Sequence, residues 1–312
     1  MEVTMAIALV LGGYGAVGRH VIALLRGLGD TALAAGRNPA LADRIIDLTE
    51  TDLASYLAAL DGMDVVVNAT GSEDPRLADR AAQRGVAFVD VTATARYIEE
   101  IECLDPQRPV MVSVGLAPGL TNLLAATVHA VTPGPLDLAV LLGAGEEHGA
   151  EATEWSYRLL GKKFLDQGRS TRNYTSPRIF DLPGHGRRRL YRVDFSDQHA
   201  LSRDLHTQVR TYFGLDSRLG TTALAILTWL PKASRAPRGI HLPGSEDWLV
   251  LARGCDGTTG WARGRNQSHA TGVIAAAAAH RVTDLPPGVH HIHDVMSLCD
   301  LPQDQGIEIH VP

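Results

Sequence analysis

The sequence feature that most constrains the fold lies near the start of the chain, where an apolar run stops at a cluster of glycines. The run "AIALVLG" (6–12) leads into Gly13-Tyr14-Gly15-Ala16-Val17-Gly18, and a helical pattern follows directly. In G-x-G-x-x-G between a strand and a helix, Gly13 permits a tight turn, Gly15 lets the backbone approach a pyrophosphate, and Gly18 lets the helix lie against the strand. The pattern therefore predicts a dinucleotide-binding turn, with phosphates at the positive end of the helix dipole. A glycine-rich turn without a ligand is the alternative.

Short β-rich apolar runs alternate with helical patterns through the first 130 or so residues, as a parallel sheet with crossover helices requires. The runs are "AIALVLG" (6–12), "TALAAG" (31–36), "RIIDL" (44–48), "DVVVNAT" (64–70), "VAFVDVT" (86–92) and "PVMVSVG" (109–115). We therefore expect an α/β protein whose residues 1–130 form a Rossmann domain, a doubly wound parallel sheet.

The pattern changes after about residue 130, where strands joined by turns replace the alternation. We expect residues 131–283 to form a second, α+β domain for substrate binding or dimerisation, built on a mixed or antiparallel sheet. A closing segment of about 284–312 can return to the first domain. The expected strands are 136–145, 206–216, two within 178–195 and two within 247–265, and the expected helices are near 151–163, 217–230 and 270–282.

Composition and charge exclude several classes of function. A net charge of −6 gives no electrostatic reason to expect nucleic acid. The basic run of Arg187 to Arg189 with Arg192 alternates with Leu190 and Val193, which favours a solvated strand face over an anion site. Three widely spaced cysteines fit neither a disulfide framework nor a thiolate metal site. No signal peptide or membrane span is expected, so we predict a cytoplasmic protein without membrane partners.

The end of the second expected strand indicates which cofactor the turn binds. An Asp or Glu at this point selects NAD by accepting hydrogen bonds from the adenosine ribose. The strand ends instead in "AAGRNP", where Arg37 supplies a planar cation suited to a 2′-phosphate. NADP(H) is therefore favoured over NAD(H), although Arg37 could also project into solvent. Asp47 could accept the adenine amino group or cap the helix that begins near Thr51.

Other polar groups follow the later strands at the carboxyl edge, where ligands bind an open α/β sheet. We expect cofactor contacts from residues in "NATG", "VDVT" and "GLAPG"; these are Asn68, Ala69, Thr70, Thr92, Gly115, Pro118 and Gly119. Asp90 could be a catalytic acid, with a buried role in stabilising the turn as the alternative.

The chain resembles the saccharopine dehydrogenase-like reductases, in the branch of saccharopine reductase and carboxynorspermidine synthase. The resemblance rests on "VLGGYGAVGRHV", "AAGR", "DVVVNATG", "FVDVT", "SVGLAPGLTNLLA" (113–125), "ARGRNQSHATGVIAAAAAHRV" and "GVHHIHDVM". It implies an NAD(P)-dependent enzyme that reduces or oxidises a C–N bond of an amino-acid conjugate. Lysine-pathway members carry Gly-Leu-Asp-Pro-Gly and then Asp-His, whereas this chain has Ala117 and then Thr121-Asn122, which marks it as a divergent member.

Catalysis is the least specified part of the sequence. Reduction of an imine or an activated C=C bond needs little beyond orientation over the nicotinamide. The Tyr-x-x-x-Lys pair of short-chain dehydrogenases is absent from the sequence. Candidate catalytic residues are Asp90, Glu154 and His269, and candidate substrate-binding residues are Asn122, Trp155, Arg158, Arg263 and Arg265.

Two further expectations concern metals and partners. His290, His291 and His293 lack a third or fourth ligand in the sequence pattern, so we expect no metal. A small-molecule substrate and a homodimer are the expected partners. The alternative function is a non-catalytic NADP-binding redox sensor that keeps the fold and has lost the substrate site.

Overall fold

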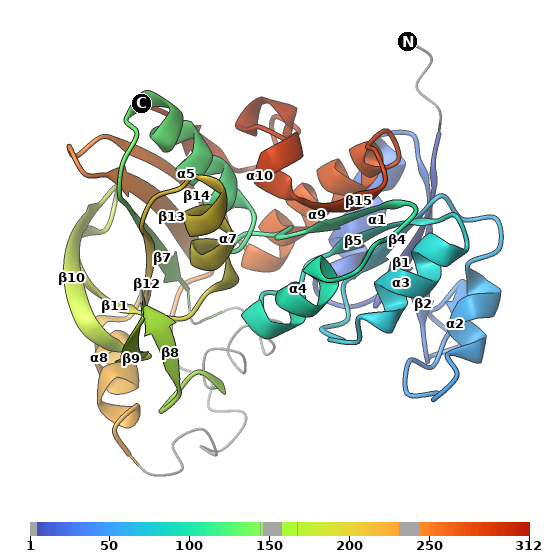
Figure 1. Cartoon of the computed structure of the whole chain (residues 1–312), viewed down its shortest axis with the longest axis horizontal. Helices are drawn as coiled ribbons and strands as arrows, with labels where there is room; N and C mark the ends of the chain where they lie inside the picture. The colour runs from blue at the N-terminus through green and yellow to red at the C-terminus, as the bar shows by residue number, and fades with distance from the viewer. Residues whose placement is uncertain (1–4, 144, 146–157, 167, 231–243) are drawn as a thin grey trace. The chain divides into compact units, whose positions relative to one another are not determined.

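In the computed structural model, the chain is described over residues 5–143, 145, 158–166, 168–230 and 244–312. It divides into two compact units (Figure 1). Unit 1 comprises Met1–Leu123 and Ser268–Gln305, and unit 2 comprises Leu124–Gln267 and Gly306–Pro312. Blue and cyan elements with part of the red C-terminal region form unit 1, and green to orange elements form unit 2.

Unit 1 is built on a seven-stranded sheet whose order is β15-β6-β5-β4-β1-β2-β3. All of its neighbouring strands pair in parallel, which confirms the expected doubly wound sheet. The strands are β1 (Ile7–Leu11), β2 (Thr31–Gly36), β3 (Arg44–Ile45), β4 (Val65–Asn68), β5 (Ala87–Asp90), β6 (Pro109–Val112) and β15 (Gly288–His291). The chain order reverses beside β1, because β2 lies on one side of it and β4 on the other. This is the switch point at which open α/β sheets bind ligands.

Local sequence explains the elements of unit 1. Every residue of β4, β5 and β6 is buried, as expected for parallel strands covered on both faces. The helices are α1 (Gly18–Gly27), α2 (Ala54–Ala59), α3 (Arg76–Gln83), α4 (Ala95–Glu102), α9 (Gln267–Val282) and α10 (Ile292–Val295). Helix α3 buries Leu77, Ala78, Ala81 and Ala82, a single apolar stripe against the sheet.

Helix α9 differs from the other helices because it is buried on nearly all sides. The run "GVIAAAAA" within it consists mostly of small residues, and every one of them is buried. A Cβ added at Gly272 would lie 2.6 Å from the Cβ of His20 on α1, so only glycine permits this approach of the two helices. We expected α9 in the second domain, but its contacts group nearly all of it with unit 1.

Unit 2 is built on a mixed sheet of seven strands in the order β10-β11-β12-β7-β13-β14-β16. Strand β12 runs parallel to β7, and the other neighbours are antiparallel, as a mixed sheet was expected to be. The strands are β7 (Leu136–Leu142), β10 (Thr175–Leu182), β11 (Gly186–Arg192), β12 (Val209–Leu215), β13 (Asp247–Gly254), β14 (Thr259–Arg265) and β16 (Glu308–His310).

Further elements of unit 2 include the hairpin of β8 (Lys163–Asp166) and β9 (Arg169–Arg172), with helices α7 (Ser196–Asp204) and α8 (Arg218–Leu227). Helix α5 (Leu120–Val131) contains the boundary between the units. The closing segment is shared, since β15 joins the first sheet and β16 pairs with β14 in the second. Across the described ranges, no helix is long and apolar enough to cross a membrane.

Candidate functional site

The glycine turn after β1 is held so tightly that side chains are excluded at three positions. A Cβ at Gly18 would lie 2.2 Å from the carbonyl oxygen of Gly12, and one at Gly13 would lie 2.7 Å from the Cα of Ala34. Gly12 has a φ of +72°, in the left-handed region that favours glycine. A Cβ at Gly15 would lie 3.0 Å from the Gly12 carbonyl oxygen, also a tight contact, but would meet no other atom within 4 Å outside the adjoining residues. The turn is therefore least crowded at Gly15.

The amide groups of the turn suit an anion. The Gly12 and Gly15 amides donate to backbone carbonyls at 2.9 and 2.8 Å. The amides of Ala16 and Val17 donate to no acceptor in the described part of the chain. Val17 is the N-cap of α1 and has no side-chain cap bond, and the first turn of the helix contains no acidic residue. Amides left open at a helix N-terminus, together with the helix dipole, attract phosphate.

Tyr14 covers the end of β2, where the adenosine half of a dinucleotide would lie. Its hydroxyl accepts a hydrogen bond from the Asn38 amide at 3.1 Å. A Cβ at Gly36 would lie 2.5 Å from that hydroxyl, so the strand ends in glycine because the tyrosine ring packs there. Arg37 is exposed, and its guanidinium makes no hydrogen bond or ion pair with the residues that the structure describes. It is available to an anionic ligand.

Asp47 has a partner within its own turn. Its carboxylate accepts hydrogen bonds from the Thr49 hydroxyl at 2.7 Å and the Thr49 amide at 3.0 Å. These bonds, and secondarily the charge of Arg37, lower the pKa of Asp47. The structure does not show the helix cap that the sequence left open, because the N-cap of α2 is Leu53 and it has no side-chain cap bond. The Asp47 carboxylate instead closes its own turn. An adenine contact stays a prediction.

Asn68 and Asp90 form the centre of a buried polar network at the ends of β4 and β5. They are in register in the parallel ladder, and the Asn68 amide donates to the Asp90 carboxylate at 2.9 Å. The carboxylate also accepts from the Tyr97 hydroxyl at 2.8 Å and the Thr92 amide at 2.7 Å. The Asn68 side-chain oxygen accepts from the Thr70 hydroxyl at 2.7 Å. Burial raises the pKa of Asp90, although these hydrogen bonds oppose the shift.

This network gives the predicted residues a definite structural role. Asn68 is fully buried, and Asp90 is 1% exposed. Their polar atoms bond to neighbouring loops, while Ala69 and Thr70 are half-buried at the same edge. The network fixes the loops after β4 and β5. Contact of Ala69, Thr70 and Thr92 with a cofactor stays a prediction.

The "GLAPG" loop after β6 is closed on itself. A Cβ at Gly119, whose φ is +134°, would lie 1.9 Å from the Gly115 carbonyl oxygen. The Asn122 side-chain oxygen accepts from the Gly119 amide at 2.9 Å, and its amide lies 3.2 Å from Nδ1 of His293. The Ala117–Pro118 peptide bond is cis. Asn122 is fully buried, and its side chain stabilises the conformation of this loop.

His269 lies against a second imidazole that the sequence reasoning missed. The rings of His20 and His269 meet edge to face with centroids 5.0 Å apart. Burial, the charge of His269 and that of Arg19 lower the pKa of His20 to about 4, and burial lowers the pKa of His269. Both side chains are therefore neutral at pH 7. Their helices, α1 and α9, are the pair brought together at Gly272, a contact that no local pattern reveals.

A second missed cluster lies behind β6. Ser113, buried and with a φ of +58°, has its hydroxyl 2.9 Å from Nδ1 of His291. Nε2 of the same imidazole lies 2.7 Å from the Glu102 carboxylate. The His293 ring is 5.5 Å from that of His291, and Nε2 of His290 contacts the Pro286 carbonyl oxygen at 2.9 Å. The side chains of the three histidines therefore contact different groups.

The substrate candidates of the second unit differ in their surroundings. Arg263 pairs with Glu308 at 2.7 Å, and Arg265 lies 3.4 Å from Asp247. Arg158 is exposed. Trp155 and the catalytic candidate Glu154 lie outside the described residues. Substrate binding by Trp155 and the three arginines stays a prediction, as does the catalytic role of Glu154.

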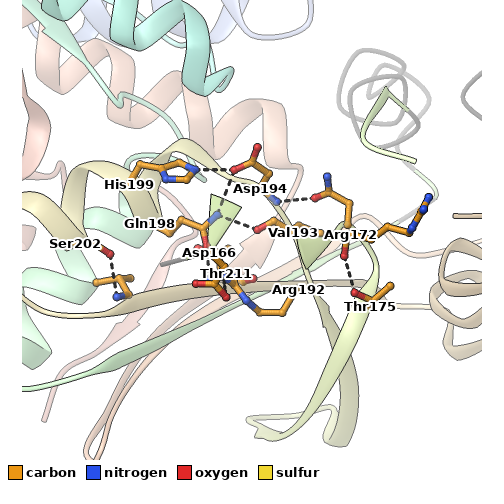
Figure 2. Close-up of polar contacts among 12 residues, drawn as sticks. Asp166, Arg172, Thr175, Arg192, Val193, Asp194, Gln198, His199, Ser202 and Thr211 are labelled. Atoms are coloured by element: carbon orange, nitrogen blue, oxygen red, sulfur yellow. Dashed lines mark hydrogen bonds and ion pairs between the residues drawn. The ribbon is translucent and has the colours of Figure 1, made fainter. Parts of the chain in front are cut away.

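A buried network around Arg192 was also missed (Figure 2). Arg192 is 2% exposed, pairs with Asp166 at 2.9 Å, and donates to the Gln198 side chain at 2.7 Å and the Thr211 carbonyl at 2.8 Å. The expected solvated strand face is therefore wrong for Arg192. It is also wrong for Arg188, which is 7% exposed.

Helix α7 carries the other half of that network. Figure 2 shows His199 turned toward Asp194, whose carboxylate lies 2.6 Å from Nε2 of the imidazole. The Gln198 amide donates to the Val193 carbonyl at 3.1 Å, which anchors the start of the helix to the end of β11. The network joins β8, β11, β12 and α7 within unit 2.

Fold and glycine turn together define an α/β protein with a Rossmann-type sheet and a second unit on a mixed sheet. Among solved structures, apo saccharopine dehydrogenase (L-Glu forming) from Saccharomyces cerevisiae matches with a TM-score of 0.59 and 15% identity, covering 92% of this chain and 94% of that chain. A mutant meso-dapdh from Clostridium tetani aligns with a TM-score of 0.47 and 12% identity, over 94% of this chain and 95% of that chain. No family model and no curated protein matches the sequence. The expected likeness to saccharopine dehydrogenase is thus confirmed for the fold.

Proposed function

We propose that the protein is an NADPH-dependent oxidoreductase that transfers hydride to a C=N bond, or to an activated C=C bond, of a small amino-acid-like or specialised-metabolite substrate. The observation that carries this proposal is the glycine turn at the switch point of the sheet. Its open amides at Ala16 and Val17, and the glycine at position 15, where a side chain would be crowded, suit a pyrophosphate. The shared fold with saccharopine dehydrogenase supports a nicotinamide cofactor.

The preference for NADPH rests on the end of β2. Arg37 is exposed there without a carboxylate partner in the described ranges, and no acidic residue follows the strand before Asp43. A guanidinium binds a phosphate in a bidentate manner. Neutral ribose hydroxyls are bound better by the carboxylate of an Asp or Glu, which accepts their hydrogen bonds. Arg37 would therefore bind the 2′-phosphate.

The chain's own residues would orient reactants more than they would exchange protons. When bound, the nicotinamide would supply the hydride, which is chemistry of the cofactor. Asp90 is engaged by three donors and fully buried, so its main effect would be to hold the loops that carry Thr70 and Thr92. His269, neutral because burial lowers its pKa, would serve as a hydrogen-bonding group and not as a cation. An already electrophilic imine suits such a site.

A fluorescence titration of the full chain with NADPH and NADH tests the cofactor assignment. We expect tighter binding of NADPH. Arg37→Ala should narrow the difference by about tenfold, the scale of one charge-assisted hydrogen bond. Arg84→Ala, which removes an exposed arginine from the C-cap of α3, is the matched control. Equal affinities in the unmutated protein would refute the NADP assignment.

A redox sensor without catalysis is the second candidate, and one observation favours it. Asn122, where lysine-pathway relatives carry an imidazole, has its amide committed to Gly119 and His293. A panel of imines, enones and keto acids separates the two functions. An enzyme oxidises NADPH in the presence of at least one of them, whereas a sensor binds NADPH tightly and consumes none.

A further inference from the structure

A cavity of about 240 Å³ in unit 2 is lined by a cluster of arginines. The lining residues come from β11 and the first turns of α8; they are Arg187, Arg188, Arg189, Tyr191, Arg218, Thr221 and Thr222. This arginine cavity, named here by those seven residues, lies wholly within one compact unit. Neither the nucleotide turn nor the substrate candidates include any of its residues.

The cavity lies where β11 and β12 are no longer paired with each other. The ladder between the two strands holds only at Tyr191–Phe213 and Arg192–Tyr212. Ahead of that ladder, the edge of β11 from Gly186 to Leu190 has no partner strand on this side within the described chain, and α8 begins just beyond the end of β12. The gap is therefore bordered by an unpaired strand edge and by the positive end of a helix.

Hydrogen bonds hold the walls of the cavity in place. The buried Arg188 guanidinium donates to the carbonyl oxygens of Leu215 and Asp216 at 2.7 and 2.6 Å. The Thr221 hydroxyl donates to the Leu215 carbonyl at 3.0 Å, and the Leu215 amide donates to that hydroxyl at 2.9 Å. The Arg218 guanidinium donates to the Arg187 carbonyl at 3.2 Å. The parts of the wall held by these bonds cost little to order when a ligand binds.

The positive charge of the cavity is not neutralised by the protein. In the described part of unit 2, none of the four arginines forms an ion pair with a carboxylate. Asp181 lies opposite Arg187 in the β10–β11 ladder without pairing to it. Burial and the nearby charge of Arg218 lower the pKa of Arg188, while Asp216 opposes the shift. Arg188 and Arg218 thus repel each other at the wall of the cavity, and an anion would relieve that repulsion.

We propose that the arginine cavity binds a small phosphorylated ligand through its phosphate oxygens. The planar guanidinium fork of arginine binds two oxygens of a phosphate group at once, and an arginine is never deprotonated at physiological pH. The exposed Arg187, Arg189 and Arg218 would contact the ligand, and Arg188 would contribute fixed charge from the wall. A cavity of about 240 Å³ accommodates a pyrophosphate group with part of its carrier.

Isothermal titration calorimetry of the full chain with inorganic pyrophosphate tests this site. The triple variant Arg187→Gln/Arg189→Gln/Arg218→Gln should weaken binding by at least about a hundredfold, because each charge-assisted contact is worth about tenfold or more. Arg218→Gln alone should weaken it by about tenfold and serves if the triple variant unfolds. The matched control, Arg84→Gln/Arg96→Gln/Arg169→Gln, removes the same charge from exposed positions outside the cavity and should change the affinity less than twofold.

The same titration separates this site from the nucleotide turn. The amides of the nucleotide turn, which are assigned to the pyrophosphate of the cofactor, are intact in the triple variant, so binding at that turn would survive in it. Retention of full affinity by the triple variant would therefore place pyrophosphate outside the cavity and overturn the proposal. The absence of any binding by the unmutated protein at millimolar pyrophosphate would overturn it as well. Citrate bound as tightly as pyrophosphate would refute recognition of phosphate. Because the proposed oxidoreductase activity does not use the cavity, none of these results bears on it.

Discussion

Replacing Asp90 by Asn tests whether the buried network after β4 and β5 holds the cofactor edge together. One carboxylate oxygen accepts from both Asn68 and Tyr97, and the other accepts from the Thr92 amide. An asparagine places an NH₂ group at one of the two oxygen positions. The less costly orientation turns that group toward Thr92, where two donors then face each other in a fully buried site.

The magnitude follows from counting unpaired groups. The Thr92 amide loses its acceptor, and at least one N–H of the new side chain lacks one too. Each buried unsatisfied group costs about 1–3 kcal/mol, so the two groups in Asp90→Asn should lower the free energy of unfolding by about 2–6 kcal/mol. Rotation of the Asn68 amide cannot supply the missing acceptor without a further loss, because its oxygen already accepts from the Thr70 hydroxyl. Tyr97→Phe removes one donor and leaves the carboxylate two others, so it should cost only about 0.5–1.5 kcal/mol.

Urea unfolding of the two variants and the unmutated protein measures these differences. The unfolding midpoints should decrease from the unmutated protein to Tyr97→Phe to Asp90→Asn. An Asp90→Asn protein with an unchanged midpoint that has lost all turnover would refute the structural account and make Asp90 a catalytic acid. NADPH titration of the same variants then reports whether the loops after β4 and β5 shape the cofactor site.

Three other substitutions test separate features. His20 is neutral in the folded protein because its pKa is lowered from 6.5 to about 4, so stability should be lost as pH falls through that interval; thermal melts of His20→Phe should show a flatter dependence between pH 7 and pH 4. Gly119→Ala should yield little folded protein by circular dichroism, because its Cβ would overlap the Gly115 carbonyl at 1.9 Å; a normal melt would contradict the described loop. Arg192→Met removes the partner of Asp166, and denaturant unfolding should show a loss of about 3 kcal/mol, the lower end for a broken buried pair; an unchanged midpoint would mean that the network is dispensable.

Much of unit 1 could be predicted because its signals are local. Each of the six expected strands contains a strand of the structure, since buried parallel strands appear as short apolar runs between helical patterns. The glycine turn was predictable for the same reason. Helix α9 was recognised as a helix, but its assignment to a unit failed because an alanine run buried on all sides carries no amphipathic direction.

The buried polar contacts could not be predicted, because their partners are distant in sequence. The imidazoles of His20 and His269 meet only through the packing of α1 on α9, and Glu102 contacts an imidazole 189 positions away. Gly36 is similar, since its lack of a side chain is explained by the tyrosine ring that packs on it from the preceding turn. Such contacts depend on the finished sheet, which places the ends of separate strands together.

The alternation of residues along β11 contained a signal that the prediction of a solvated arginine face did not take into account. Alternate residues of a strand share a face, so Arg188 and Arg192 have the same parity as the fully buried Leu190 and should have been assigned to its side. A charged residue on the parity of a core leucine must find polar partners or a water-filled space. Arg192 finds Asp166 and Gln198, whereas Arg188 finds only carbonyl oxygens beside a cavity. The positive charges of these two arginines on the same face are thus balanced differently. Arg192 has a carboxylate partner, whereas Arg188 has none in the described structure and borders the cavity proposed to bind an anion.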